Sequence, residues 1–163
     1  MDPEGALLAS SSRGCTVYDR KDREAKGLIL DVGSGLKRQG DVNVDLDGIC
    51  CDVKADAQYL PFRTGSFTKA ICHHTLEHID DVERSLDEML RVTKRALEIT
   101  VPYRFSFTAH GKQHKHVFTS KWFRNYAEKN ALQYRGRITI DPERTFYMIP
   151  LQLQVFIWKR TAK

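Results

Sequence analysis

A glycine turn followed by two carboxylates gives this sequence the spacing of a nucleoside-binding site. The mostly apolar run Gly27–Val32 ends at Gly33–Gly35, where missing Cβ atoms let a ligand approach the backbone. Ten positions after Gly35, Asp45 follows a second apolar run and can accept hydrogen bonds from both hydroxyls of a ribose. Asp56 follows a third run and can accept one from an adenine amino group, although either carboxylate alone could instead cap a turn.

The same turn argues against a dinucleotide. A dinucleotide fingerprint needs a third glycine three residues after Gly35, and Arg38 stands there. Nothing then brings a helix close to a pyrophosphate, so NAD and FAD are disfavoured. The glycine turn and the two carboxylates together predict an adenosine site without a phosphate clamp.

Histidines form the second group of residues that could do chemistry. His74, Glu77 and His78 match H-x-x-E-H, the zinc pattern of inverted zincins, in which the glutamate serves as base. Such a protease needs a long helix around the motif, whereas this segment follows a strand and precedes capping aspartates. We therefore favour histidines that line a ligand pocket and predict no metal. A later set, His110, His114 and His116, could bind a metal or an anion, but an exposed basic loop explains it better.

Aromatic and cationic residues alternate between positions 103 and 118. They are Tyr103, Arg104, Phe105, Phe107, Lys112, Lys115 and Phe118. This segment follows a predicted strand, at the edge where open α/β sheets bind ligands. It could stack a base or cover an acceptor pocket, and a plain packed loop is an equal alternative.

Apolar runs and helical spacing predict the elements that must position these residues. We expect strands at 27–32, 42–46, 51–54, 66–73, 97–101, 134–140 and 151–159. One helix should start at Asp80 or Asp81 and bury Leu86 and Met89, and another should run from a Thr119 cap to about Asn130. This alternation predicts an α/β fold with a Rossmann-like, mostly parallel sheet, an antiparallel C-terminal strand and helices on both faces.

Composition indicates one globular domain. Of 163 residues, 41% are hydrophobic and 29% charged, so we expect an N-terminal arm or short helix at 1–26 and a single domain at 27–163. No apolar run approaches the ~20 residues of a membrane helix. The start of the chain lacks a basic, apolar secretory signal, and the four cysteines show no framework spacing, so we expect cytoplasmic placement and free thiols. The net charge of +5 allows an anionic partner such as RNA or an acidic protein.

Several motifs occur in an order that resembles a known family. The series LDVGSG (30–35), VNVD (42–45), DAQYLPFRTGSF (56–67), HHTLEHIDDVERSLDEMLRVTK (73–94) and ALEITVP (96–102) resembles class I S-adenosylmethionine-dependent methyltransferases of the type 11 group. The resemblance implies S-adenosylmethionine as cofactor. It implies cofactor-binding residues at Asp31, Gly33, Ser34, Gly35, Asp45, Leu46, Asp56, Ala57 and His73. His73, His74 and Tyr103 are the candidates for orienting or deprotonating the methyl acceptor.

Within that resemblance the chain departs at three places. The short interval between Gly35 and Asp45 leaves no room for the usual crossover helix, so residues 35–40 should form a loop, as in a short branch of the family. Thr68 replaces a common aspartate, and Lys94–Ala96 replace a glycine pair. We expect methyl transfer to an unidentified acceptor, which could be RNA, protein or a small metabolite. The alternatives are a non-catalytic or regulatory subunit of a heteromeric complex, or an RNA-binding module, and a protein partner or homodimer is possible.

Overall fold

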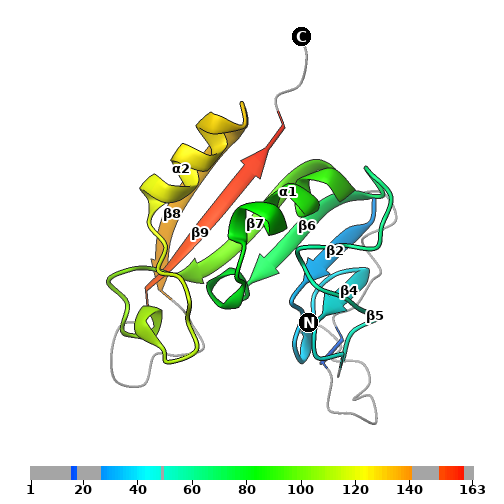
Figure 1. The fold of residues 1–163 in the computed structure, drawn as a ribbon, viewed down its shortest axis with the longest axis horizontal. Helices are drawn as coiled ribbons and strands as arrows, with labels where there is room; N and C mark the ends of the chain where they lie inside the picture. The colour runs from blue at the N-terminus through cyan, green and yellow to red at the C-terminus, as the bar shows by residue number, and fades with distance from the viewer. Residues whose placement is uncertain (1–15, 18–26, 49, 141–150, 160–163) are drawn as a thin grey trace, which may run out of the picture.

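A seven-stranded sheet forms the centre of the computed structural model, which describes residues 16–17, 27–48, 50–140 and 151–159 (Figure 1). Its strand order is β5-β4-β2-β6-β7-β9-β8. The bounds are β2 Ile29–Val32, β4 Val42–Asp45, β5 Val53–Lys54, β6 Phe67–His73, β7 Thr93–Pro102, β8 Gln133–Ile140 and β9 Leu151–Trp158. Strand β9 is antiparallel to both of its neighbours, and the other pairs are parallel. The expected Rossmann-like sheet with an antiparallel C-terminal strand is therefore confirmed.

Parallel pairing brings the carboxyl ends of three strands together. Val32 of β2 lies opposite Val44 of β4, and Asp31 lies opposite Ile71 of β6. The chain segments that leave these strands must therefore meet at one edge of the sheet. The residues singled out by their chemistry in the sequence follow these strand ends.

The two α-helices begin at the capping residues expected from the sequence. Helix α1 spans Val82–Val92, and the Asp81 carboxylate accepts a hydrogen bond from the backbone N–H of Arg84 at 3.0 Å. Helix α2 spans Ser120–Lys129, and the Thr119 hydroxyl accepts one from the backbone N–H of Trp122 at 3.2 Å. Two short 3-10 turns, η1 at Leu76–His78 and η2 at Phe107–His110, lie in the connections.

Alternate residues of the central strands build the core. Leu97 and Ile99 of β7 pair directly with Ile157 and Val155 of β9, and all four are buried. Leu86 and Met89 of α1 and Phe123 of α2 belong to the same buried cluster. Both helices thus pack on the apolar face that period-two alternation creates on these strands.

A loop replaces the crossover helix between β2 and β4. Residues 33–41 contain only the two-residue strand β3, Lys37–Arg38, which pairs in parallel with β1, Thr16–Val17. The buried Asp31 carboxylate accepts a hydrogen bond from the backbone N–H of Gln39 at 2.9 Å. The buried Asn43 amide accepts another from the backbone N–H of Gly40 at 3.1 Å. These side chains fold the loop back onto the sheet, and the prediction of a loop is confirmed.

One expectation about the cysteines was wrong. Cys50 is disulfide-bonded, whereas Cys51 and Cys72 are free thiols. A disulfide requires two cysteines that the fold brings close, and spacing along the chain does not reveal that proximity. Of the expected N-terminal arm or short helix, only Thr16–Val17 lie within the described residues. In the described residues, we find no helix with the length and apolar character to cross a membrane.

The buried Asp31 makes stability depend on pH. Burial raises the pKa of Asp31 from its ordinary value of 3.8 to about 6, against the lowering effect of the Gln39 N–H. A raised pKa means that the folded state binds more protons than the unfolded state, so stability falls as pH rises from about 4 to 6. Over this pH range, we expect the free energy of unfolding of the wild type to fall by on the order of 3 kcal/mol relative to that of Asp31→Asn. Urea unfolding of both proteins at several pH values measures the difference. If the free energies of unfolding of the two proteins change equally with pH, the raised pKa of Asp31 is wrong.

Candidate functional site

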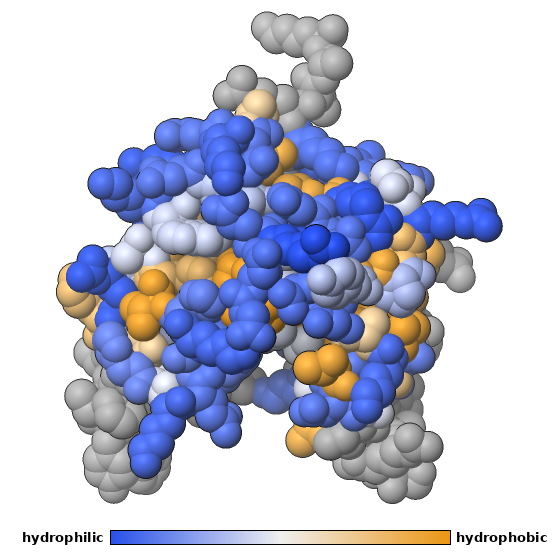
Figure 2. Space-filling model, in the orientation of Figure 1, coloured by the Kyte–Doolittle hydropathy of each residue, from blue (hydrophilic) through white to orange (hydrophobic). Residues whose placement is uncertain are grey.

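A cavity of about 460 Å³ opens at the carboxyl edge of β2, β4 and β6. Its lining residues are Val32, Gly33, Gly35, Val44, Asp45, Leu46, Asp47, Ala55, Asp56, Ala57, Gln58, His74, Thr75, His78, Ile79, Asp80, Gln113 and Lys115. Figure 2 shows a hollow at the lower edge of the molecule, where the arrowheads of these strands point in Figure 1. The wall combines apolar groups with carboxylates and a cation, which suits a ligand that is partly apolar and partly polar.

Asp45 is fixed at the end of β4 by two backbone donors. Its Oδ2 accepts a hydrogen bond from the N–H of Gly35, and its Oδ1 accepts one from the N–H of Asp47, both at 2.9 Å. Each carboxylate oxygen keeps a second lone pair, so Asp45 can still accept from ligand hydroxyls. Gly35 has a φ of +52°, and a Cβ there would meet nothing within 4 Å, so the backbone faces open space.

Asp56 marks the other side of the cavity. Its Oδ1 accepts a hydrogen bond from the backbone N–H of Gln58 at 2.8 Å, which shapes the turn after β5. Glu88 of α1 holds the following residues, because it accepts the backbone N–H of Leu60 at 2.9 Å. Arg91 donates to the Leu60 carbonyl at 2.9 Å, and its hydrogen bond to Glu88 lowers the pKa of that carboxyl. Helix α1 thereby fixes the segment that carries Asp56.

Most of the predicted cofactor-binding residues line this cavity. They are Gly33, Gly35, Asp45, Leu46, Asp56 and Ala57, and the catalytic candidate His74 joins them. Asp31 and Ser34 are buried, and they are not among the lining residues. The Ser34 N–H donates to the Val44 carbonyl at 3.1 Å, which ties the glycine turn to β4.

The structure does not place His73 and Tyr103 among the lining residues. His73 alternates with Cys72 along β6, on the side of Lys69, whose ammonium pairs with Glu98 at 2.6 Å. Burial lowers the pKa of His73, and the Glu98 charge opposes this shift. Tyr103 donates its backbone N–H to Leu151 at 2.9 Å, and its ring lies against Phe105. Of the catalytic candidates, only His74 borders the cavity.

Sequence reasoning missed several lining residues. Gln113 belongs to the loop between β7 and α2 and reaches the cavity from far along the chain. Asp47 and Gln58 each lie two positions after a predicted carboxylate, Asp45 or Asp56. This proximity in the sequence is the signal from which they could have been predicted. Lys115 was named in the aromatic and cationic segment expected to cover a pocket, and it does line the cavity, with its ammonium 2.7 Å from Asp80.

The arrangement fits an adenosyl group. Asp45 offers carboxylate oxygens for ribose hydroxyls, and Asp56 offers an acceptor beside the apolar side chains of Ala57 and Ile79. The open backbone at Gly35 leaves room for the group that extends from the ribose. The fold is a Rossmann-like sheet, and this donor set lies at the edge where such sheets bind ligands.

Comparison with known proteins finds a similar family for part of the chain. Residues 30–96 match the model of a family described as a methyltransferase domain. No curated protein matches the chain. Residues 30–96 are therefore similar to a methyltransferase domain, and the structure shares the fold of S-adenosylmethionine-dependent methyltransferases.

Solved structures share the fold at low sequence identity. A Thermotoga maritima S-adenosylmethionine-dependent methyltransferase, described as a possible histamine N-methyltransferase, is similar with a TM-score of 0.67 and 18% identity over 83% of each chain. A Methanosarcina mazei S-adenosylmethionine-dependent methyltransferase has a TM-score of 0.61 and 16% identity over 82% of this chain and 92% of that one. A Haloferax volcanii protein solved with the Trm112 methyltransferase activator has a TM-score of 0.61 and 13% identity over 82% of each.

Two glycines of the turn should respond differently to alanine. Gly33 has a φ of +73°, and a Cβ there would lie 2.1 Å from the Thr75 hydroxyl oxygen. Gly33→Ala should therefore lower the free energy of unfolding by about 2 kcal/mol or more, through strain and a clash. Gly35→Ala should cost only about 1 kcal/mol, because its Cβ meets no protein atom. Chemical denaturation measures the free energy of unfolding of both variants. An equal decrease in the two would contradict the conclusion that a Cβ clashes at Gly33 and not at Gly35.

Proposed function

We propose that this chain transfers a methyl group from S-adenosylmethionine to an acceptor bound beside the same cavity. The observation that carries the proposal is the Asp45 carboxylate, held by two backbone N–H groups at the mouth of a glycine turn. Asp45 binds the ribose, Asp56 and Ala57 meet the adenine, and Gly33 and Gly35 face the methionine moiety. Asp31 and Ser34 hold the turn, and Leu46 covers the adenosine.

The proposed catalysis depends mainly on alignment. S-adenosylmethionine supplies a methyl group on a positively charged sulfur, which an acceptor atom displaces in line. An enzyme gains much from holding both partners in register and needs a base only if the acceptor has a proton to lose. His74 is best placed for that task because it lines the cavity. His73 and Tyr103 remain candidates with less support, since they lie outside the lining set.

The acceptor is open among RNA, a protein side chain and a small metabolite. The net charge of +5 and the ammonium of Lys115 at the cavity support an anionic acceptor. A cytoplasmic location stays a prediction: the free thiols of Cys51 and Cys72 support it, and the Cys50 disulfide weighs against it.

A second candidate is a subunit that binds the cofactor within a heteromeric complex. The loop at 33–41 in place of a crossover helix favours this alternative, because it removes a layer of the usual fold. The Haloferax volcanii neighbour was solved with a methyltransferase activator, which makes a protein partner reasonable for a fold of this kind. An RNA-binding module without cofactor binding is a third reading, and it requires the carboxylates of the cavity to be incidental.

Cofactor binding can be tested directly by calorimetric titration of the full chain with S-adenosylmethionine and S-adenosylhomocysteine. We expect one site, and Asp45→Ala should weaken binding about tenfold or more, since a good ligand hydrogen bond to a charged group contributes about 1.5–3 kcal/mol. Glu83→Gln is the matched control, because Glu83 pairs with Lys129 on the surface of the helices. Unchanged affinity in Asp45→Ala would remove the ribose assignment, and no binding by the wild type would favour the RNA-binding module.

Turnover separates an enzyme from a binding subunit. The full chain would be incubated with methyl-labelled S-adenosylmethionine and with RNA, protein and small-molecule fractions of a cell extract. We expect label in one fraction, and His74→Ala should reduce it by about tenfold or more while leaving cofactor affinity within about threefold. Cofactor binding without any incorporation would favour the non-catalytic subunit.

A further inference from the structure

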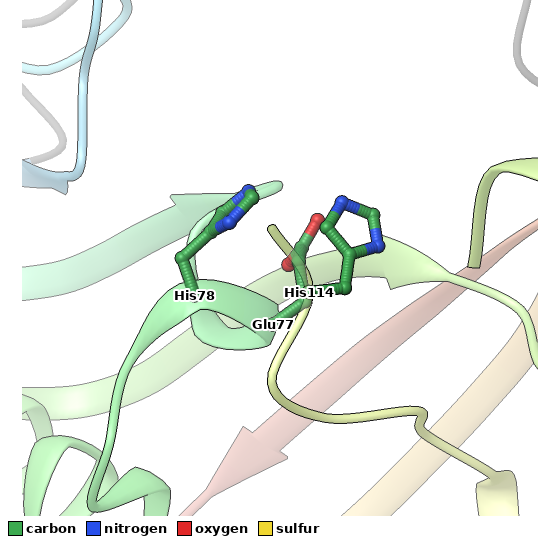
Figure 3. A group of neighbouring side chains, drawn as sticks. All are labelled: Glu77, His78 and His114. Atoms are coloured by element: carbon green, nitrogen blue, oxygen red, sulfur yellow. The ribbon is translucent and has the colours of Figure 1, made fainter. Parts of the chain in front are cut away.

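Glu77, His78 and His114 form a cluster of potential metal ligands at the wall of the cavity (Figure 3). One ligand atom from each residue lies within 4.8 Å of those from the other two. Glu77 and His78 are neighbours in turn η1, whereas His114 comes from the loop between β7 and α2. The imidazole rings of His78 and His114 meet edge to face with their centroids 4.8 Å apart, and Figure 3 shows the Glu77 carboxylate beside them. His78 also lines the cofactor cavity, so the cluster and the cavity share a wall.

Glu77 carries a buried carboxylate that lacks a full set of partners. The residue is 1% exposed, and within the described part of the chain its Oε2 has no hydrogen-bond partner. Its Oε1 lies 3.5 Å from Nδ1 of His74. A buried carboxylate oxygen without a partner is costly, and a bound cation would supply the missing interaction.

Both imidazoles are held so that one ring nitrogen is left for an ion. Nδ1 of His78 lies 3.1 Å from the Gln113 carbonyl oxygen, and Nδ1 of His114 lies 3.3 Å from that of Ala109. A carbonyl oxygen only accepts, so each Nδ1 carries the proton and donates. In the neutral ring, Nε2 then has a free lone pair. Histidines that bind metals in proteins are typically oriented in this way.

His74 lies next to the cluster. It has a φ of +52°, a left-handed conformation that is uncommon and costly for a residue with a side chain. Its backbone N–H donates to the Thr100 carbonyl at 2.8 Å, which holds this conformation at the end of β6. His74 is thereby kept with its ring beside Oε1 of Glu77, and within the described residues its Nδ1 makes no hydrogen bond.

We propose that Glu77, His78 and His114 bind a divalent transition-metal ion of the zinc type. Imidazole and carboxylate are donors that such ions take, and sites with three protein ligands keep a position open for water or substrate. That position would face the cavity and could bind an oxygen or nitrogen atom of a molecule there. The site differs from the H-x-x-E-H protease pattern, because His114 replaces His74 as a ligand and η1 replaces the long helix. It does not depend on methyl transfer.

Titration of the chelator-stripped full chain with Zn²⁺ in a calorimeter tests the site, and Co²⁺ provides a visible absorption spectrum. We expect one equivalent to bind, and His114→Ala and His78→Ala should each weaken binding about tenfold or more. His110→Ala is the matched control, because His110 lies in the same loop outside the cluster and contacts the Arg104 carbonyl instead. That variant should bind as the wild type does.

Two outcomes would overturn the proposal. One is the absence of stoichiometric Zn²⁺ and Co²⁺ binding by the wild type, and the other is equal binding by the wild type and His114→Ala. S-adenosylmethionine titration of the same samples keeps this test separate from the proposed function. Metal binding that depends on His114 supports the site whether or not the cofactor binds. Equal melting temperatures of the chelator-stripped wild type and variants show that any loss of metal binding reflects lost ligands and not unfolding.

Discussion

The buried Asp31 carboxylate is the interaction on which the glycine turn and the loop at 33–41 depend. Parallel strands usually need a connection of about a dozen residues or more, commonly a helix, and residues 33–41 are too few for one. The hydrogen bond from Gln39 to Asp31 turns the short segment back toward the sheet. Asn43 then binds Gly40 and Asp52, and Asp52 pairs with Arg38. Side-chain hydrogen bonds thus perform the task that the backbone of a helix performs elsewhere.

This arrangement also explains the position of the glycine turn. Gly40 passes so close to β2 that a Cβ there would lie 2.7 Å from the Asp31 backbone nitrogen. The loop is therefore compact, and it returns the chain to β4 with the Gly35 N–H against Asp45. A buried carboxylate costs free energy, which the raised pKa of Asp31 reflects. The cost arises because a buried polar side chain, and not a helix, holds the short loop between the parallel strands β2 and β4.

The sequence predicted the sheet, the helix caps and the loop because local chemistry determines each of them. Asp81 and Thr119 satisfy backbone donors of their own helices. The interval from Gly35 to Asp45 is too short to contain a crossover helix. The two neighbouring histidines could not be assigned in this way. His73 is the last residue of β6, whereas His74 has a φ of +52° that turns the chain out of the strand, so only His74 borders the cavity. Contacts such as Cys50 in a disulfide or His114 beside Glu77 need the tertiary fold.

The two sides of the cavity differ in how they are built. Asp45 and Asp56 are fixed by hydrogen bonds to nearby backbone, and helix α1 holds the segment after Asp56 through Glu88. The opposite side receives Gln113 and Lys115 from the loop between β7 and α2, whose backbone N–H at Lys115 donates to the Glu77 carbonyl at 2.7 Å. Loops on a rigid scaffold are where proteins vary their ligands. One wall of the cavity is therefore fixed by the sheet edge and helix α1, and the other wall is supplied by a loop, where a change of sequence would disturb the sheet least.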